Sequence, residues 1–184
     1  MQDQAYKHCS ESRVSISQLM LPSHSNFGGK IHGGYILSMM DEVAFACGSK
    51  HSGHYCVTAS VNTVDFLAPI EIGELVTMKA SVNYVGNSSM VIGIKVEAEN
   101  IQSGISKHCN SSYFTMVAKD ENSKSVKVPG LILRSLDDVR RFVRSIQRQA
   151  HNASRRKEFK EDVFLYEKYL NQLDGYNVKI DVKK

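Results

Sequence analysis

The sequence predicts an α+β domain, with an antiparallel five-stranded sheet wrapped around one long central helix and a helical extension after it. Three observations predict this fold. Five segments between residues 13 and 119 have strand character, one apolar helical segment lies between the first two, and no other helical pattern occurs before Pro129. Parallel strands would need crossovers, usually helical, between each pair, and a closed barrel would leave the helix without a place.

Each element is predicted from its own pattern. Arg13–Leu21 alternates apolar and polar residues, which is typical of a half-buried strand. Tyr35–Ser49 has apolar residues on most of its helical surface, so we expect it to be enclosed, and Gly48 and Gly53 mark its end. The remaining strands, connected as hairpins, are predicted at Tyr55–Leu67, Glu74–Val85, Ser89–Glu99 and Lys107–Lys119.

The open edges of such a sheet predict an oligomer. A single helix covers only part of a five-stranded sheet, and the edge strands stay unpaired. Pairing with a second copy of the chain would protect an edge, so at least a dimer is expected.

Charge divides the chain into two regions. The 184 residues carry 23 Lys and Arg against 19 Asp and Glu. Residues 1–130 hold 10 basic and 11 acidic side chains and residues 131–184 hold 13 and 8, so the net charge of +4 comes from the second region. Pro129-Gly130 separates strand-like sequence from a helical pattern. We therefore predict a domain at 1–130 and a basic amphipathic helical tail at 131–184.

Composition excludes several classes of protein. With 42% hydrophobic and 23% charged residues the chain can build a core, so it is not disordered throughout. No apolar run approaches the ~20 residues of a membrane span, and residues 1–12 lack the apolar segment of a secretory signal. We expect a cytoplasmic protein. The four cysteines form no C-x-x-C pair and the histidine spacings match no metal site, so buried thiols and no metal are expected.

A glycine-rich loop leads into the central helix. Four glycines stand within seven residues (28–34), and Gly33-Gly34 would begin the helix. Without side chains in the way, the amides of Gly33 and Gly34 can hydrogen-bond a carbonyl oxygen as it becomes an oxyanion, assisted by the helix dipole. The alternative is a tight loop packed on the sheet.

Asp41 is the most unusual residue of the helix, because apolar residues flank it on both sides. Gly34 lies two turns earlier on the same face. A carboxylate in such surroundings is either the ion-pair partner of a lysine or a catalytic base or nucleophile. Glu42 points about 100° away around the helix and cannot easily act on the same group.

These residues resemble the hotdog-fold acyl-CoA thioesterases, in particular the bacterial acyl-CoA hydrolases related to brain-type acyl-CoA hydrolase. Asn26, Gly29 and Gly33-Gly34 match the family pattern Asn-x-x-Gly-x-x-x-Gly-Gly, and Met40-Asp41-Glu42 follows it at the family spacing. The stretches 61–70 and 73–74 resemble the family's second-strand signature and its next turn. The likeness covers roughly residues 13–130.

The resemblance implies hydrolysis of an acyl-CoA thioester. Asp41 would act as general base or nucleophile and Asn26 would position the water or the thioester, the two residues coming from opposite subunits. CoA is part of the substrate, so no cofactor is expected. A thiolate leaves with little acid assistance, since the pKa of a thiol is about 8.5, and the Gly-x-Ser-x-Gly elbow of α/β-hydrolases is absent. The family also implies a trimer of dimers.

Further expectations concern residues around this site. Gly86, Asn87, Ser88 and Ser89 resemble a family segment near the CoA nucleotide, although they also suit a plain hairpin turn. His32 is expected to hydrogen-bond the loop backbone rather than to take part in catalysis. Tyr35, Met39 and Phe66 would line an acyl tunnel whose depth, and hence the acyl-chain preference, depends on packing.

The tail is predicted to begin a helix at Ser135, with an apolar stripe of Leu136, Val139, Phe142 or Val143, Ile146 and Ala150 and a second helix over 159–170. We expect this second helix to pack on the body or on a neighbouring subunit. Its arginines would alternatively contact the CoA phosphates or an anionic membrane surface, and no nucleic-acid motif is evident.

Two other functions compete with hydrolysis. One is a non-catalytic acyl-CoA sensor on the same fold. The other is a dehydratase or hydratase, whose expected histidine and carboxylate pattern is missing.

Overall fold

The computed structural model describes residues 5–161 and 176–178, without side chains for 155–161. The chain divides into two compact units, residues 1–146 and 147–184. The second unit is described by the remainder of helix α2 (Leu136–Glu161) and by residues 176–178. The predicted second helix over 159–170 lies mostly outside the described residues, and the predicted boundary at 130 stays a prediction.

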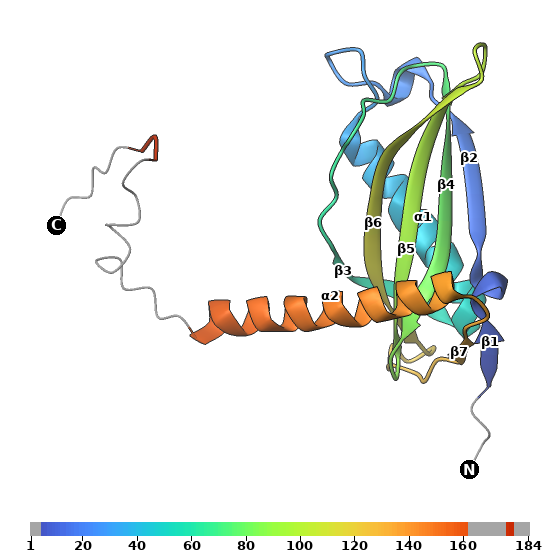
Figure 1. Cartoon of the computed structure of the whole chain (residues 1–184), viewed down its shortest axis with the longest axis vertical. Helices are drawn as coiled ribbons and strands as arrows, with labels where there is room; N and C mark the ends of the chain where they lie inside the picture. Colours follow the sequence, from blue (N-terminus) through green and yellow to red (C-terminus); the bar gives the residue numbers. More distant parts are fainter. Residues whose placement is uncertain (1–4, 162–175, 179–184) are drawn as a thin grey trace. The chain divides into compact units, whose positions relative to one another are not determined.

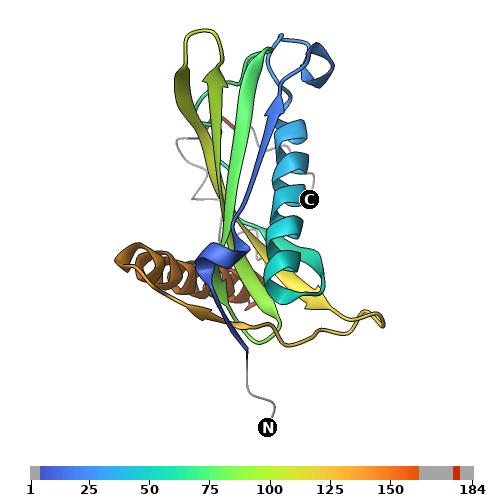
Figure 2. The same cartoon turned by 90° about the vertical axis from the view of Figure 1, so that its right-hand side faces the viewer.

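The first unit is the predicted sheet and helix (Figure 1). Its main sheet has the order β2 (Val14–Leu19), β4 (Glu74–Val85), β5 (Ser89–Asn100), β6 (Ile105–Lys119) and β3 (Tyr55–Val61), with all neighbours antiparallel. Helix α1 (Gly33–Ser52) lies against one face of this sheet (Figure 2). The predicted fold class is confirmed.

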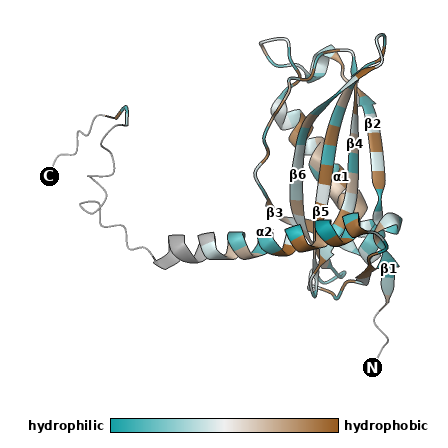
Figure 3. Ribbon diagram, in the orientation of Figure 1, coloured by the Kyte–Doolittle hydropathy of each residue, from teal (hydrophilic) through white to brown (hydrophobic). Residues whose placement is uncertain are grey.

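The core lies between α1 and the inner face of the sheet. Strands β2, β4, β5 and β6 carry alternating hydrophobic and hydrophilic residues (Figure 3). Met78, Ile92 and Phe114 are among the fully buried side chains on the inner face, and Met40 and Val43 meet them from α1. All four cysteines are buried free thiols, as predicted, and burial raises the pKa of Cys47 to about 12, so this thiol stays protonated.

Two short strands are absent from the sequence prediction. β1 (Tyr6–His8) pairs in parallel with β7 (Gly130–Ile132), so a second, two-stranded sheet joins the beginning of the chain to the segment before α2. Three residues are too few to show a periodic pattern. The second predicted strand, Tyr55–Leu67, was too long. β3 ends at Val61, and beyond it the backbone hydrogen bonds to β6 among the described residues come from the amides of Asn62 and Leu67, which are too few for a ladder.

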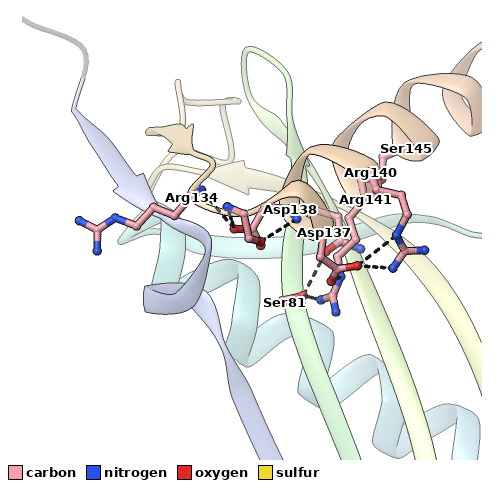
Figure 4. A network of polar contacts seen from close by, with 9 residues as sticks. Ser81, Arg134, Asp137, Asp138, Arg140, Arg141 and Ser145 are labelled. Carbon is pink, nitrogen blue, oxygen red and sulfur yellow. Dashed lines mark hydrogen bonds and ion pairs between the residues drawn. The ribbon is translucent and has the colours of Figure 1, made fainter.

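The start of α2 packs on the outer face of β4. Ser135 and Asp138 cap the helix reciprocally, as predicted for its first turn: the Asp138 amide donates to Ser135 Oγ at 3.1 Å and the Ser135 amide donates to Asp138 Oδ2 at 3.1 Å (Figure 4). Arg141 binds Asp137 and reaches Ser81 on β4 (Figure 4). Phe142 lies against Tyr84, with ring centroids 5.1 Å apart.

The predicted apolar stripe faces β4 only in part. Phe142, one of its alternative members, lies against Tyr84, whereas Leu136, Val139, Val143 and Ile146 are exposed. The predicted packing of the second helix, on the body or on a neighbouring subunit, concerns residues mostly outside the described part of the chain and stays a prediction. No helix in the described part of the chain is long and apolar enough to cross a membrane.

Candidate active site

The loop before α1 is built around the side chain of Asn26. Its carboxamide oxygen accepts hydrogen bonds from the amides of Gly28 (2.9 Å) and Lys30 (3.2 Å). The Asn26 amide donates to the Lys30 carbonyl at 2.7 Å, and Gly29 has φ +76°, which favours glycine. The Asn26 NH2 group makes no hydrogen bond to any described residue and remains available as a donor.

His32 caps α1. The amide of Gly34 donates to His32 Nδ1 at 2.9 Å, which confirms that this histidine binds the loop backbone. The same contact corrects one prediction, because the Gly34 amide is already engaged and does not face a ligand. Of the two predicted oxyanion donors, only Gly33 has an amide without an acceptor among the described residues. The Phe66 ring covers Gly33, with Cζ 3.2 Å from the place where a β-carbon would stand.

Asp41 and Thr58 form the second part of the site. Asp41 is exposed on α1, two turns after Gly34, and its Oδ1 accepts a hydrogen bond of 2.5 Å from the Thr58 hydroxyl. Thr58 stands on the edge strand β3, where the pairing register shifts between Thr58 and Ser60. Such a bulge redirects the side chains beside it. No lysine partner of Asp41 occurs among the described residues, so the ion-pair alternative is not supported.

Thr58 was not predicted. A threonine in a strand is common, because β-branched residues favour strands, and nothing in the local pattern distinguishes this one. The only local signal is the irregular alternation of polar and apolar residues over 58–60. It can be interpreted as a bulge only once the strand pairing is known. The contact joins residues 17 positions apart on different elements, and only the fold brings them together.

Gly86–Ser89 lies at the other end of α1. The turn joins β4 to β5, at the end of the sheet where α1 finishes, whereas Asn26 lies at the end where α1 begins (Figures 1 and 2). A helix of 20 residues spans about 30 Å. Within one chain, therefore, the predicted CoA-binding turn and the Asn26 loop cannot serve the same thioester.

The turn itself is held by backbone hydrogen bonds. The Ala118 amide donates to the Ser88 carbonyl at 2.9 Å, and the Val128 amide donates to the Asn87 carbonyl at 2.9 Å. The Gly86 amide donates to the Ser89 carbonyl at 2.8 Å. A role of these residues in binding CoA stays a prediction.

The predicted tunnel residues lie near the beginning of α1. Met39 is buried in the core, Phe66 is half exposed over Gly33, and Tyr35 accepts a hydrogen bond from Gln18 at 2.6 Å and stacks on His24. The described residues contain no group of three His, Cys, Asp or Glu side chains that could hold a metal ion.

Comparison with known proteins identifies the family. The Thioesterase superfamily model matches residues 28–105. The Helicobacter pylori protein VdlD is 39% identical over 138 residues, which are 75% of this chain and 79% of VdlD. An uncharacterized acyl-CoA thioester hydrolase of Bacillus subtilis, YkhA, is 30% identical over 151 residues, 82% of this chain and 88% of its own. The chain belongs to the hotdog-fold acyl-CoA thioesterase family.

Solved structures of family members agree in fold. An acyl-CoA hydrolase from Staphylococcus aureus, determined with butyryl-CoA and CoA, has a TM-score of 0.78 and 30% identity over 91% of this chain and 99% of its own. A hexameric acyl-CoA thioesterase has a TM-score of 0.80 and 29% identity over 82% of this chain and 97% of its own.

Three residue types of this site were also changed in variants of the Staphylococcus aureus hydrolase. In them an asparagine, an aspartate 15 positions later and a threonine 17 positions beyond the aspartate were each replaced by alanine. Asn26, Asp41 and Thr58 have the same types at the same spacings.

Proposed function

We propose that this protein hydrolyses acyl-CoA thioesters to a carboxylic acid and CoA, at a site formed by Asp41 and Thr58 of one subunit and the Asn26 loop of another. The observation that carries the proposal is the 2.5 Å hydrogen bond from the Thr58 hydroxyl to Asp41. It holds an exposed carboxylate in one orientation beside an open strand edge. The family relationship and the matching spacings of the three residues support it.

The chemistry follows from the partners of each group. Thr58 occupies Oδ1 of Asp41, so Oδ2 is the oxygen that takes a proton from the attacking water. The water oxygen bonds to the thioester carbon, and the carbonyl electrons move to oxygen, where the Gly33 amide and the Asn26 NH2 group donate hydrogen bonds. Collapse of the intermediate breaks the C–S bond and releases CoA as a thiolate, which then takes up the proton.

A second copy completes the site. Asn26 lies before the first turn of α1 and Asp41 lies more than two turns into it, so one chain does not bring both to a single carbonyl. If two copies pair by twofold symmetry across the open edge of β3, their α1 helices run antiparallel. The beginning of one helix then meets the Gly86–Ser89 turn of the other, which places the oxyanion donors and the CoA turn at one site. We propose a trimer of such dimers, as in the hexameric relatives.

The first test measures thiol release with a chromogenic disulfide reagent from acetyl-CoA through palmitoyl-CoA. We expect turnover by the wild type and at least ~100-fold less by Asp41→Asn, the scale of a positioned acid or base. The matched control is Glu42→Gln, which removes the neighbouring exposed carboxylate and should retain activity. Binding of acyl-CoA without turnover by the wild type would instead support the sensor function.

The second test mixes inactive subunits. Asn26→Ala and Asp41→Ala chains, unfolded together and refolded, form mixed dimers in which one of the two sites has both residues intact. We expect recovery of activity in proportion to the mixed fraction. An absence of recovery in mixed dimers verified by mass spectrometry would contradict a site shared between subunits.

The remaining expectations belong to this proposal. Hydrolysis needs no cofactor beyond the CoA of the substrate, and the location is cytoplasmic, as for the cytosolic relatives. The experiment with the substrate panel also gives the acyl-chain preference.

A further inference from the structure

Phe27 is the most exposed large apolar residue among those described. Its exposure is 114%, so its ring has essentially no neighbour in its own chain, and it directly follows Asn26. Burial of a phenylalanine side chain away from water is favourable. A phenylalanine ring that its own chain leaves in water beside a site residue therefore offers an apolar surface to a binding partner.

The loop presents this ring in a fixed position. Asn26 closes the turn through four hydrogen bonds with the residues that follow Phe27, and Ser25 and Ile31 pair across its base. Lys30 and Glu71 form an ion pair at 2.6 Å and an antiparallel bridge, which attach the loop to the segment before β4. Phe27 and the Asn26 NH2 group are thus parts of one preformed turn, and a contact that holds the ring also holds the amide.

The face of α1 around Asp41 offers an apolar surface. Leu37 lies one turn before Asp41 and Phe45 one turn after it, and both are exposed, at 37% and 40%. Tyr55 at the start of β3 lies against Phe45, with ring centroids 5.6 Å apart, and is 62% exposed. The carboxylate is therefore flanked along the helix by apolar side chains that the same chain leaves partly exposed.

These two features fit each other in a pair of chains. Consecutive Cα atoms are about 3.8 Å apart, so a chain that brings Asn26 to the Asp41 of a second copy also brings Phe27 to the helix face around that Asp41. We infer that Phe27 is an anchor that packs between Leu37 and Phe45 of a second copy of this chain and thereby positions Asn26 at the second copy's Asp41. This inference rests on the proposed shared site and names its positioning residue.

The decisive experiment adds Phe27→Ser to the mixed subunits. In a mixed dimer the intact site takes its Asn26 loop from the Asp41→Ala chain. Phe27→Ser in that chain should reduce the recovered turnover at least ~10-fold, whereas the same change in the Asn26→Ala chain should leave it within about twofold. Phe27→Leu in the Asp41→Ala chain should restore most of the loss, because an apolar side chain remains.

The outcomes separate three explanations. An equal loss whichever chain carries Phe27→Ser would mean that the ring only holds subunits together, and no loss in either chain would mean that it does nothing. Both results overturn the inference. If the mixed dimers without Phe27→Ser show no recovery, the shared site fails, and the anchor is then judged by fluorescence alone.

Fluorescence tests the anchor without activity. The chain has no tryptophan, so Phe27→Trp introduces a single reporter. In the absence of any ligand we expect blue-shifted emission, which is typical of a buried indole, and a shift to the red when Leu37→Ser and Phe45→Ser are added. Emission typical of water that shifts only after CoA is added would show that the ring contacts the ligand, and would overturn the inference.

Discussion

The two ends of α1 differ in how completely a single chain finishes them. At its beginning, Phe27 and Phe66 are exposed, and the Gly33 amide has no acceptor among the described residues. At its end, Gly53 closes the helix in the left-handed conformation (φ 74°), and His51 is fully buried, with Nε2 3.0 Å from the Pro129 carbonyl oxygen.

The end of α1 is also tied to distant parts of the chain. Lys7 of β1 donates to the His51 carbonyl at 2.7 Å, and a β-carbon on Gly48 would stand 3.2 Å from Ile92. The end of the helix is therefore held by its own chain, whereas its beginning leaves apolar rings exposed, where we propose that a second subunit and the substrate bind. We expect changes at the two ends to separate stability from activity.

After Asp41 and Asn26, the largest effect should come from Thr58. A hydrogen bond to a charged group contributes about 1.5–3 kcal/mol, so Thr58→Val should reduce kcat roughly 10–100-fold in the thiol-release assay. Thr58→Ser keeps the hydroxyl and should stay within a few-fold of the wild type. Because Thr58 is exposed in the single chain, neither change should alter stability much. Equal activity of the two variants would show that the hydroxyl does not orient Asp41.

A pair of alanine substitutions compares the two ends directly. In Gly34→Ala the new β-carbon would stand 2.8–2.9 Å from ring atoms of His32, so the histidine must leave the cap, at a cost of about 1 kcal/mol. Gly53→Ala should cost a similar amount, because an alanine is strained at φ 74°. Urea unfolding should give similar losses, while turnover should fall several-fold only in Gly34→Ala. A comparable loss of turnover in Gly53→Ala would remove the distinction.

His51 should give the supporting end a pH dependence. Burial lowers the pKa of His51 below its usual 6.5, and the nearby Lys7 acts in the same direction. The unfolded chain therefore binds the proton more readily than the folded one, so this stability is complete above about pH 6.5 and falls as the pH drops below it. His51→Gln removes the titration, and its melting temperature should decline less between pH 7 and 5 than that of the wild type. Parallel declines would contradict this role.

The smallest effect should arise on the outer face of the sheet, away from both ends. Hydrogen bonds from Lys79 and Lys95 hold the pKa of Glu97 at about 2. Its contribution is present above the ordinary pKa near 4.5 and is lost as the pH falls toward 2. Glu97→Gln should cost no more than about 1 kcal/mol in urea unfolding at neutral pH, and less in high salt. The exposed Glu99, changed to Gln, is the control and should show no salt-dependent loss.

Regular patterns made most of the first unit predictable. The alternation in β4 and β5 and the apolar surface of α1 gave these elements nearly their observed limits, because burial on one or all sides imposes a period on the sequence. The paired strands β1 and β7 are too short to show a periodic pattern of apolar residues. The stripe of α2 was predicted as a pattern that left Phe142 and Val143 as alternatives, and only the structure shows that Phe142 meets β4 while Val143 is exposed.

By itself the sequence determined the fold class, the oligomer expectation and, through resemblance, the importance of Asn26 and Asp41. Only the tertiary structure decided that Thr58 binds Asp41, that His32 takes the Gly34 amide, and that Asn26 and Gly86–Ser89 lie at opposite ends of α1. The physical reason is that a sequence pattern is local, whereas these contacts join distant parts of the chain. A period records whether a residue is buried, whereas a hydrogen bond between residues on separate elements depends on distances that no local pattern contains.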